Sequence, residues 1–165
     1  MEPTIQPFLA LMREIYIGSE GKDTFVIDRD PGLGIISAVK TVSADDASTP
    51  SHDGGTTIAA HTGHLKWSLD YALEFYKGKI PEGWNWDDSW TRFNVNDEEW
   101  EELQRELAAS YERLITTINN VNDWSNPMLL KGTLALLPHA SYHLGAIKQL
   151  MLTIKKQEKT AMGLQ

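Results

Sequence analysis

An apolar residue returns every three or four positions through the segment from residue 96 to residue 118. These residues are Trp100, Leu103, Leu107, Tyr111, Leu114 and Ile118. Such a period places them on one face of an α-helix, as a helix in a bundle requires. Asn96 and Glu99 form a capping-box pattern, and the acidic residues between them suit the positive end of the helix dipole. The segment therefore predicts a long amphipathic helix that begins just after Asn96.

Three further segments show helical periodicity. They span Pro3 to about Tyr16, Thr56 or Thr57 to about Lys77, and Pro127 to about Lys156. Pro138 lies inside the last one and predicts either a kink just before His139 or a division into two helices. Together the four segments predict an all-α fold, a four-helix bundle, in one domain covering residues 1–165.

Two connections between these helices are unusual. Residues 18–55 are rich in Gly, Pro, Asp and Ser, and we expect a long loop with one short helix around residues 33–42. Residues 84–90 carry three of the six tryptophans. The structural interpretation is that their indoles seal one end of the bundle, and the functional alternative is a lid or a ligand platform.

The composition narrows the possible functions. The chain has no cysteine, so any metal must be bound through nitrogen and oxygen, and a thiol in its chemistry has to come from a substrate. The formal net charge of -8 argues against nucleic-acid binding. No stretch is long and apolar enough to cross a bilayer, and residues 1–4 lack the features of a signal peptide. We therefore expect a cytoplasmic protein.

His139 and His143 are four residues apart, which places both imidazoles on the same face of a helix. An apolar stripe runs close to that face through Leu144, Ile147, Met151 and Ile154. The pair therefore points toward a core or a cleft, where a buried ring needs a partner. A shared divalent metal is one possibility, and two core histidines paired with carbonyls or water are the other.

A stable metal site with an open position usually has a third protein ligand, and the second predicted helix supplies His61 and His64. Periodicity slightly favours His61 as the buried ring. No general base stands out, because nearby Ser68, Tyr71 and Tyr142 are better explained by packing or hydrogen bonding. His52 is expected to be an exposed loop residue.

Two motifs resemble the DinB/YfiT-like superfamily of metal-dependent helical-bundle proteins. The first is Thr57-Ile58 followed by Ala60-His61-Thr62-Gly63-His64-Leu65, and the second is His139-Ala140-Ser141-Tyr142-His143-Leu144-Gly145. The resemblance covers nearly the whole chain and its helix order. It implies that His64, His139 and His143 bind a divalent metal ion such as nickel, zinc or iron. His61 would then pack beside the site or hydrogen-bond to a ligand.

The resemblance also implies a function. Relatives are similar to transferases of low-molecular-weight thiols, so we expect a metal-dependent thiol S-transferase, or a related hydrolase, acting on a small electrophile. The alternative is a non-catalytic metal-binding bundle of the stress response. Homodimers are common in the family, and we expect one here. Gly145 and Ala146 depart from family patterns, and Gly145 replaces the acidic residue of the iron-dependent sulfoxide synthases.

Overall fold

The computed structural model describes residues 5–19, 24–28, 32–78, 82–161 and 163, and within these ranges it contains helices and no strand. The long helices are α1 (Ile5–Tyr16), α4 (Ile58–Tyr76), α5 (Asp97–Asn119) and α6 (Pro127–Ala161). Shorter elements are α2 (Ile35–Val39), α3 (Ala44–Ser48) and the 3₁₀ helix η1 (Trp86–Ser89). The prediction of an all-α bundle is confirmed.

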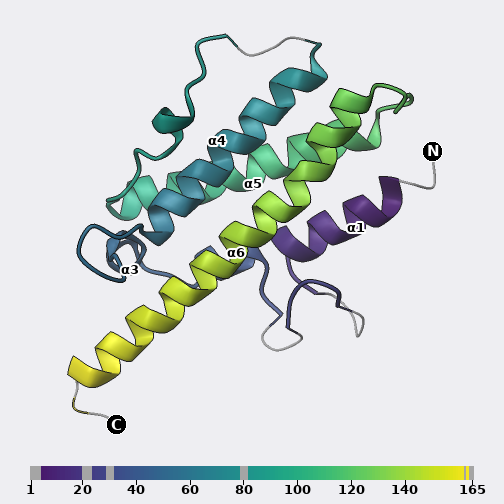
Figure 1. The fold of residues 1–165 in the computed structure, drawn as a ribbon. Coiled ribbons are helices and arrows are strands. Elements are labelled where there is room, and N and C mark those ends of the chain that lie inside the picture. The colour runs from purple at the N-terminus through teal and green to yellow at the C-terminus, as the bar shows by residue number, and fades with distance from the viewer. Residues whose placement is uncertain (1–4, 20–23, 29–31, 79–81, 162, 164–165) are drawn as a thin grey trace.

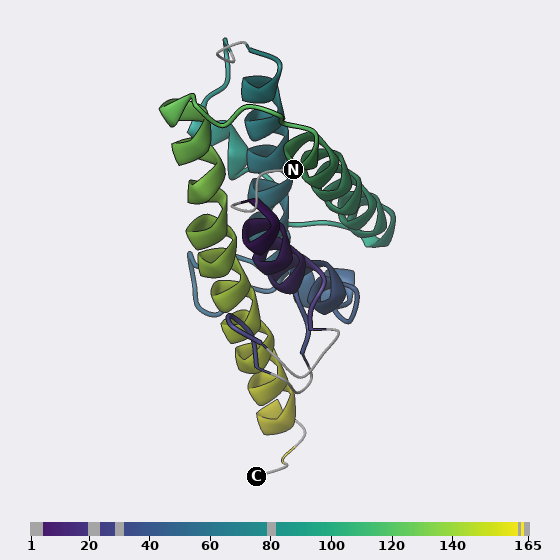
Figure 2. The same ribbon diagram turned by 90° about the vertical axis from the view of Figure 1, so that its right-hand side faces the viewer.

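The long helices pack around one apolar core. α4 contacts both α5 and α6, and α1 contacts α6 and α5. Figure 1 shows α6 running across the whole molecule, and Figure 2 shows α1 lying between α6 and α5. The periodic residues predicted for residues 100–118 are all buried on α5. Burial of this face is what holds α5 in the bundle.

The N-terminus of α5 has the capping box that the sequence predicts. The backbone N–H of Glu99 donates to Asn96 Oδ1 at 2.9 Å, and the backbone N–H of Asn96 donates to Glu99 Oε2 at 2.9 Å. These bonds satisfy donors that the first turn of a helix cannot pair internally.

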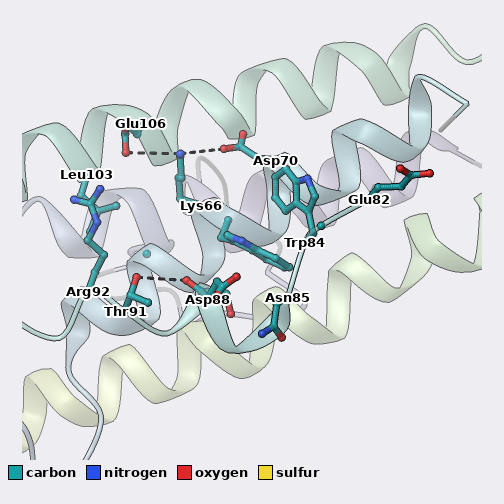
Figure 3. Close-up of a pocket in the computed structure, with 14 residues that line it drawn as sticks. Lys66, Asp70, Glu82, Trp84, Asn85, Asp88, Thr91, Arg92, Leu103 and Glu106 are labelled. Carbon is teal, nitrogen blue, oxygen red and sulfur yellow. Dashed lines mark hydrogen bonds and ion pairs between the residues drawn. The ribbon is translucent and has the colours of Figure 1, made fainter. Parts of the chain in front are cut away.

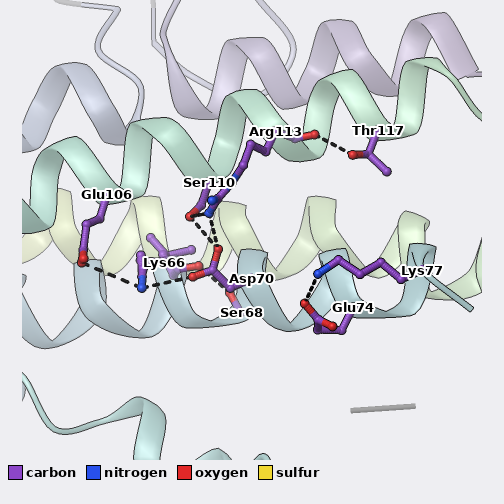
Figure 4. Close-up of polar contacts among 10 residues, drawn as sticks. Lys66, Ser68, Asp70, Glu74, Lys77, Glu106, Ser110, Arg113 and Thr117 are labelled. Carbon is purple, nitrogen blue, oxygen red and sulfur yellow. Dashed lines mark hydrogen bonds and ion pairs between the residues drawn. The ribbon is translucent and has the colours of Figure 1, made fainter. Parts of the chain in front are cut away.

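A polar cluster joins α4 to α5 on their outer side (Figure 4). The carboxylate of Asp70 accepts from Ser110 Oγ at 2.7 Å and from Arg113 at 2.9 Å. It also pairs with Lys66 at 3.1 Å. The cluster supplements the apolar contacts and fixes the register of the two helices.

The section between α1 and α4 is more ordered than the predicted loop. α2 lies within the range where a short helix was expected, but α3 was not predicted. α3 is only five residues long, too short for a periodic pattern, and its start is marked by Ser43, whose side chain accepts from the backbone N–H of Asp46. Ala44 and Ala47 are buried, and α3 packs on α4 and α5.

α6 is one helix of 35 residues with Pro138 inside it. The alternative of two separate helices is therefore wrong. Pro138 lies on the exposed side of α6, while packing against α1, α2 and α4 stabilises the helix despite the missing backbone N–H. None of the helices in the described part of the chain is both long and apolar enough to cross a membrane.

Candidate metal site

Three histidines from two helices meet in the space between α4 and α6. His64 Nε2 lies 3.0 Å from His139 Nε2, which lies 3.1 Å from His143 Nε2. One ligand atom from each ring lies within 4.8 Å of the other two. Nitrogens bound to one tetrahedral zinc ion are separated by roughly 3.4 Å, because each Zn–N bond is about 2.1 Å long. The three rings are therefore placed to bind one divalent ion.

Solvent has unequal access to these rings. His64 and His143 are 4% and 2% exposed, whereas His139 is only partly buried. His139 follows the exposed Pro138 in α6, and its Nε2 lies beside that of His64. The accessible side of the triad is therefore the side of His139.

Ser89 determines which nitrogen of His64 carries the proton. Its hydroxyl donates to the backbone oxygen of Trp86 at 2.5 Å, so it is free to accept from His64 Nδ1 at 2.7 Å. His64 Nδ1 is then protonated, and Nε2 directs its lone pair toward the other two rings.

A second chain of hydrogen bonds orients His143. Its Nδ1 lies 2.9 Å from His61 Nδ1, and His61 Nε2 lies 3.1 Å from the hydroxyl of Thr56. A proton on His143 Nδ1 donates to His61, and the Nε2 proton of His61 then donates to Thr56. This arrangement leaves the Nε2 lone pair of His143 facing the triad.

With the Nδ1 atoms of His64 and His143 protonated, the lone pairs of the triad are suited to bind a cation. His64 and His143 each present an Nε2 lone pair, and His139 Nε2 can carry one proton at most, so three mutually close nitrogens cannot all be paired by hydrogen bonds. A divalent cation satisfies all three together. The donor set contains imidazoles alone, with no carboxylate among the described members of the group.

Burial keeps these imidazoles neutral. It lowers the pKa of His64 to about 4, with smaller effects from His139 and His61. Burial, followed by the same kind of repulsion from neighbouring histidines, lowers the pKa of His143 to about 3. Burial alone lowers the pKa of His61 to about 4, and it also lowers the pKa of His139. Neutral imidazole is the form that binds a metal, so no proton has to be displaced at neutral pH.

Two of the three indoles in the segment 84–90 contact the histidines. Trp90 stacks on His64 with ring centroids 4.3 Å apart and meets His61 edge-on at 5.3 Å. Trp86 lies 5.7 Å from His64 and 6.5 Å from His139. Trp90 thus covers one face of His64, whereas Trp86 lies on the side of His139.

A separate cavity of about 380 Å³ lies between α4, α5 and residues 82–92 (Figure 3). Lys66 lies on its wall and pairs with Asp70 at 3.1 Å and Glu106 at 3.9 Å. The histidines do not line this cavity, but Ser89, which contacts His64, is one of its lining residues. The cavity therefore lies beside the triad and is not its entrance.

The other candidates have structural explanations. Ser68 donates to the backbone oxygen of Leu65 at 2.8 Å, and Tyr71 stacks on Trp67. His52 is exposed and contacts the backbone oxygen of Asp53 at 2.9 Å, as expected for a loop residue. Tyr142 is largely exposed and meets the ring of His143 edge-on.

Sequence reasoning missed Ser89 and Thr56 as partners of the histidine rings. Ser89 lies at the end of η1, 25 positions from His64, and no spacing rule connects hydroxyls and histidines of separate elements over that distance. The sequence indicates Thr56 as a possible helix cap, and its position five residues before His61 also places its hydroxyl within reach of that ring.

Comparison with known proteins agrees with this geometry. The family model described as the DinB superfamily matches residues 35–147, which include both histidine motifs and more than half of the chain. Searches of curated proteins and of solved structures found no significant match. The chain belongs to the DinB superfamily.

Proposed function

We propose that this protein is a divalent-metal-dependent enzyme that transfers a low-molecular-weight thiol to a small electrophile, or hydrolyses such an electrophile. The observation that carries the proposal is the meeting of His64, His139 and His143 through three Nε2 atoms at one partly accessible point. The same arrangement supports binding of a nickel, zinc or iron ion, and its three neutral donors do not distinguish among these metals.

A divalent ion held by three neutral imidazoles keeps its full charge, and this charge lowers the pKa of a thiol or water bound at an open position. The residues of the chain prepare that position. Ser89 keeps the Nε2 lone pair of His64 directed inward, and His61 does the same for His143. Trp90 stacks on the ring of His64 and covers one of its faces.

The thiol has to be a separate molecule, because the chain contains no cysteine. Its sulfur would enter beside His139, which is the most accessible of the three rings. Transfer of this thiol agrees with the resemblance to thiol-dependent members of the family, and water in its place gives hydrolysis.

The first test is metal content. We expect protein purified without a histidine tag to contain about one divalent ion per chain, with the three imidazoles as its protein ligands. His64→Ala and His139→Ala should lose the ion, and His52→Ala, which alters an exposed loop histidine, should retain it. Elemental analysis measures the content, and circular dichroism verifies that the variants remain helical. Equal metal content in all four proteins would contradict the proposed site.

The second test is turnover. Wild-type protein, supplied with a small thiol and an electrophilic dye, should consume the thiol, whereas His139→Ala should fold normally and be inactive. A different outcome would support a non-catalytic metal-binding bundle. In that case His139→Ala folds but loses the metal, and the wild type shows no turnover with any thiol or with water. Loss of folding in the metal-free variants, again with no wild-type turnover, would support an ion that only fastens α4 to α6.

A further inference from the structure

Trp86 exposes half of its indole next to the accessible side of the triad. Its side chain is 51% exposed, although large aromatic side chains are usually buried. The ring meets that of His139 edge-on at 6.5 Å, and His139 is the most exposed residue of the triad. The exposed indole of Trp86 therefore lies beside the most exposed histidine of the triad.

The exposed indole continues into a row of aromatic rings on α4 and the following segment. Trp86 contacts Trp67 at 5.0 Å and Tyr71 at 5.7 Å, and Tyr71 contacts Phe75 at 5.2 Å. Phe75 is 39% exposed. The result is an aromatic surface that begins at the triad, and contiguous exposed apolar surface of this kind commonly marks a binding site.

The two tryptophans nearest the triad differ in a way that separates packing from binding. Trp90 lies nearly parallel to His64, with an angle of 17° between the rings, and is partly buried. Trp86 is tilted by 39° to His64 and leaves part of its ring open to solvent. The indole of Trp90 therefore packs against the histidines of the protein, whereas the indole of Trp86 has exposed surface on which a planar ligand can bind.

We propose that the electrophile is an aromatic compound, and that its ring stacks on Trp86 while its reactive carbon lies beside His139. This inference rests on the proposed function for the chemistry, but the binding of an aromatic ring at Trp86 can be measured without it. Stacked and edge-to-face aromatic contacts add selectivity beyond simple apolar burial, so Trp86 is a specificity-determining residue.

An arylmethyl halide is a suitable electrophile of this kind. The sulfur of the thiol forms a bond to its benzylic carbon as the carbon–halogen bond breaks. The halide leaves with the bonding electrons, and the thiol proton passes to solvent. The products are an arylmethyl thioether and a hydrogen halide, with no oxidant or reductant required.

Binding can be tested with unreactive ligands. The protein, with the metal it carries when purified, is labelled with 5-fluorotryptophan, which gives one fluorine resonance for each of its six tryptophans. Benzyl alcohol is compared with cyclohexylmethanol, which has a ring of similar size without aromatic faces. We expect benzyl alcohol to shift the resonance that is missing in Trp86→Leu, and cyclohexylmethanol to shift it much less.

Selectivity is then measured with benzyl bromide and cyclohexylmethyl bromide. Each catalysed rate is divided by the uncatalysed rate with the same thiol, which removes their different intrinsic reactivities. We expect Trp86→Leu to reduce the preference for the benzyl compound roughly three- to tenfold, the range that one aromatic contact provides. Trp84→Leu is the matched control, since Trp84 belongs to the same segment, is 37% exposed, and contacts Trp67 and Tyr71.

The two proposals can fail separately. Turnover with equal normalised rates for both bromides, or an unchanged preference in Trp86→Leu, would overturn the aromatic substrate and leave thiol transfer intact. Absence of all turnover, combined with a benzyl-specific shift of the Trp86 resonance, would overturn thiol transfer and retain the aromatic site. Equal shifts from benzyl alcohol and cyclohexylmethanol would overturn stacking on Trp86.

Discussion

Hydrogen-bonding side chains outside the triad determine where its lone pairs point. His61, which contacts Thr56, lies on the side of His143, and Ser89 lies on the side of His64. Many metal-binding histidines are oriented by a carboxylate, but here the outer partners are a neutral imidazole and a hydroxyl. These partners orient the rings without adding negative charge to the site.

We expect removal of either outer partner to weaken metal binding. Ser89→Ala leaves the Nδ1 proton of His64 without its acceptor, and His61→Ala does the same for His143. The apparent dissociation constant should rise roughly 10- to 100-fold in each variant. Competition with a coloured chelator measures this change, and His52→Ala serves as the control. Wild-type affinity in both Ser89→Ala and His61→Ala would show that the rings are held by packing alone.

Glu14 plays a different part, because its buried carboxylate organises a loop far from the histidines in sequence. It accepts hydrogen bonds from the backbone N–H groups of Phe25, Val26 and Ile27, with N···O distances between 2.7 and 3.2 Å. Burial acts to raise the pKa of Glu14, but the three backbone donors outweigh it, and the pKa is lowered. The ionised form therefore stabilises the folded chain.

This lowered pKa predicts how stability depends on pH. Because the folded-state pKa of Glu14 lies below its unfolded value, its contribution is present above the unfolded pKa and disappears as the pH falls through the folded one. We expect Glu14→Gln to lower the free energy of unfolding by about 1–3 kcal/mol at neutral pH. Urea unfolding from neutral pH to about pH 3 should show the difference between the two proteins shrinking. A constant difference would mean that the charge is not involved.

At the scale of elements, two adjacent threonines at the start of α4 have separate roles. Thr57 is the N-cap, since its hydroxyl accepts from the backbone N–H of Ala60 at 3.1 Å and donates to the backbone oxygen of Phe93 at 2.9 Å. The hydroxyl of Thr56 instead contacts His61 Nε2. The sequence allowed either residue as the cap.

Replacement by valine, which has nearly the same shape, separates these roles. We expect Thr57→Val to lower the free energy of unfolding by about 1–2 kcal/mol, because it removes the cap. Thr56→Val should change stability less and weaken metal binding more, because it acts through His61 on His143. Urea unfolding of metal-free protein and chelator competition measure the two effects. The reverse pattern would contradict this division.

The contrast between helices and loops explains how much could be predicted from the sequence. The faces of α1, α4, α5 and α6 follow from periodic apolar residues, so their existence and approximate bounds were predictable. α3 has no such period. The spacing of His139 and His143 predicted their shared face. Periodicity slightly favoured His61 over His64 as the buried ring, but the structure buries both to the same 4% exposure.

At the scale of the whole molecule, the outer face of α6 is exposed among the residues that the structure describes. A second stripe, separate from the one that faces the core, follows steps of three and four through exposed positions. Its members are Leu134, Pro138, Tyr142, Gly145, Gln149 and Leu152. Leu134, Tyr142 and Leu152 are 48%, 68% and 61% exposed. This spacing is typical of a helix that packs against another helix.

We therefore expect a homodimer in which α6 packs against α6 of a second copy. Leu152→Lys places a charge in that contact, away from the histidines, and should convert the dimer to a monomer. Phe25→Lys is the control, because Phe25 is 83% exposed but lies outside α6. Light scattering coupled to size-exclusion chromatography measures the mass. A dimeric Leu152→Lys protein would assign the interface elsewhere, and a monomeric wild type would contradict the dimer.

The meeting of His64 with His139 joins positions 75 residues apart in a chain that has no disulfide. An ion at this point would be a removable cross-link between α4 and α6, formed only in the native state. Its contribution to stability grows with the logarithm of free metal concentration once that exceeds the dissociation constant. The resistance of the protein to proteolysis would then follow the metal concentration. It would fall while the site is still nearly saturated, before any loss of metal-dependent activity.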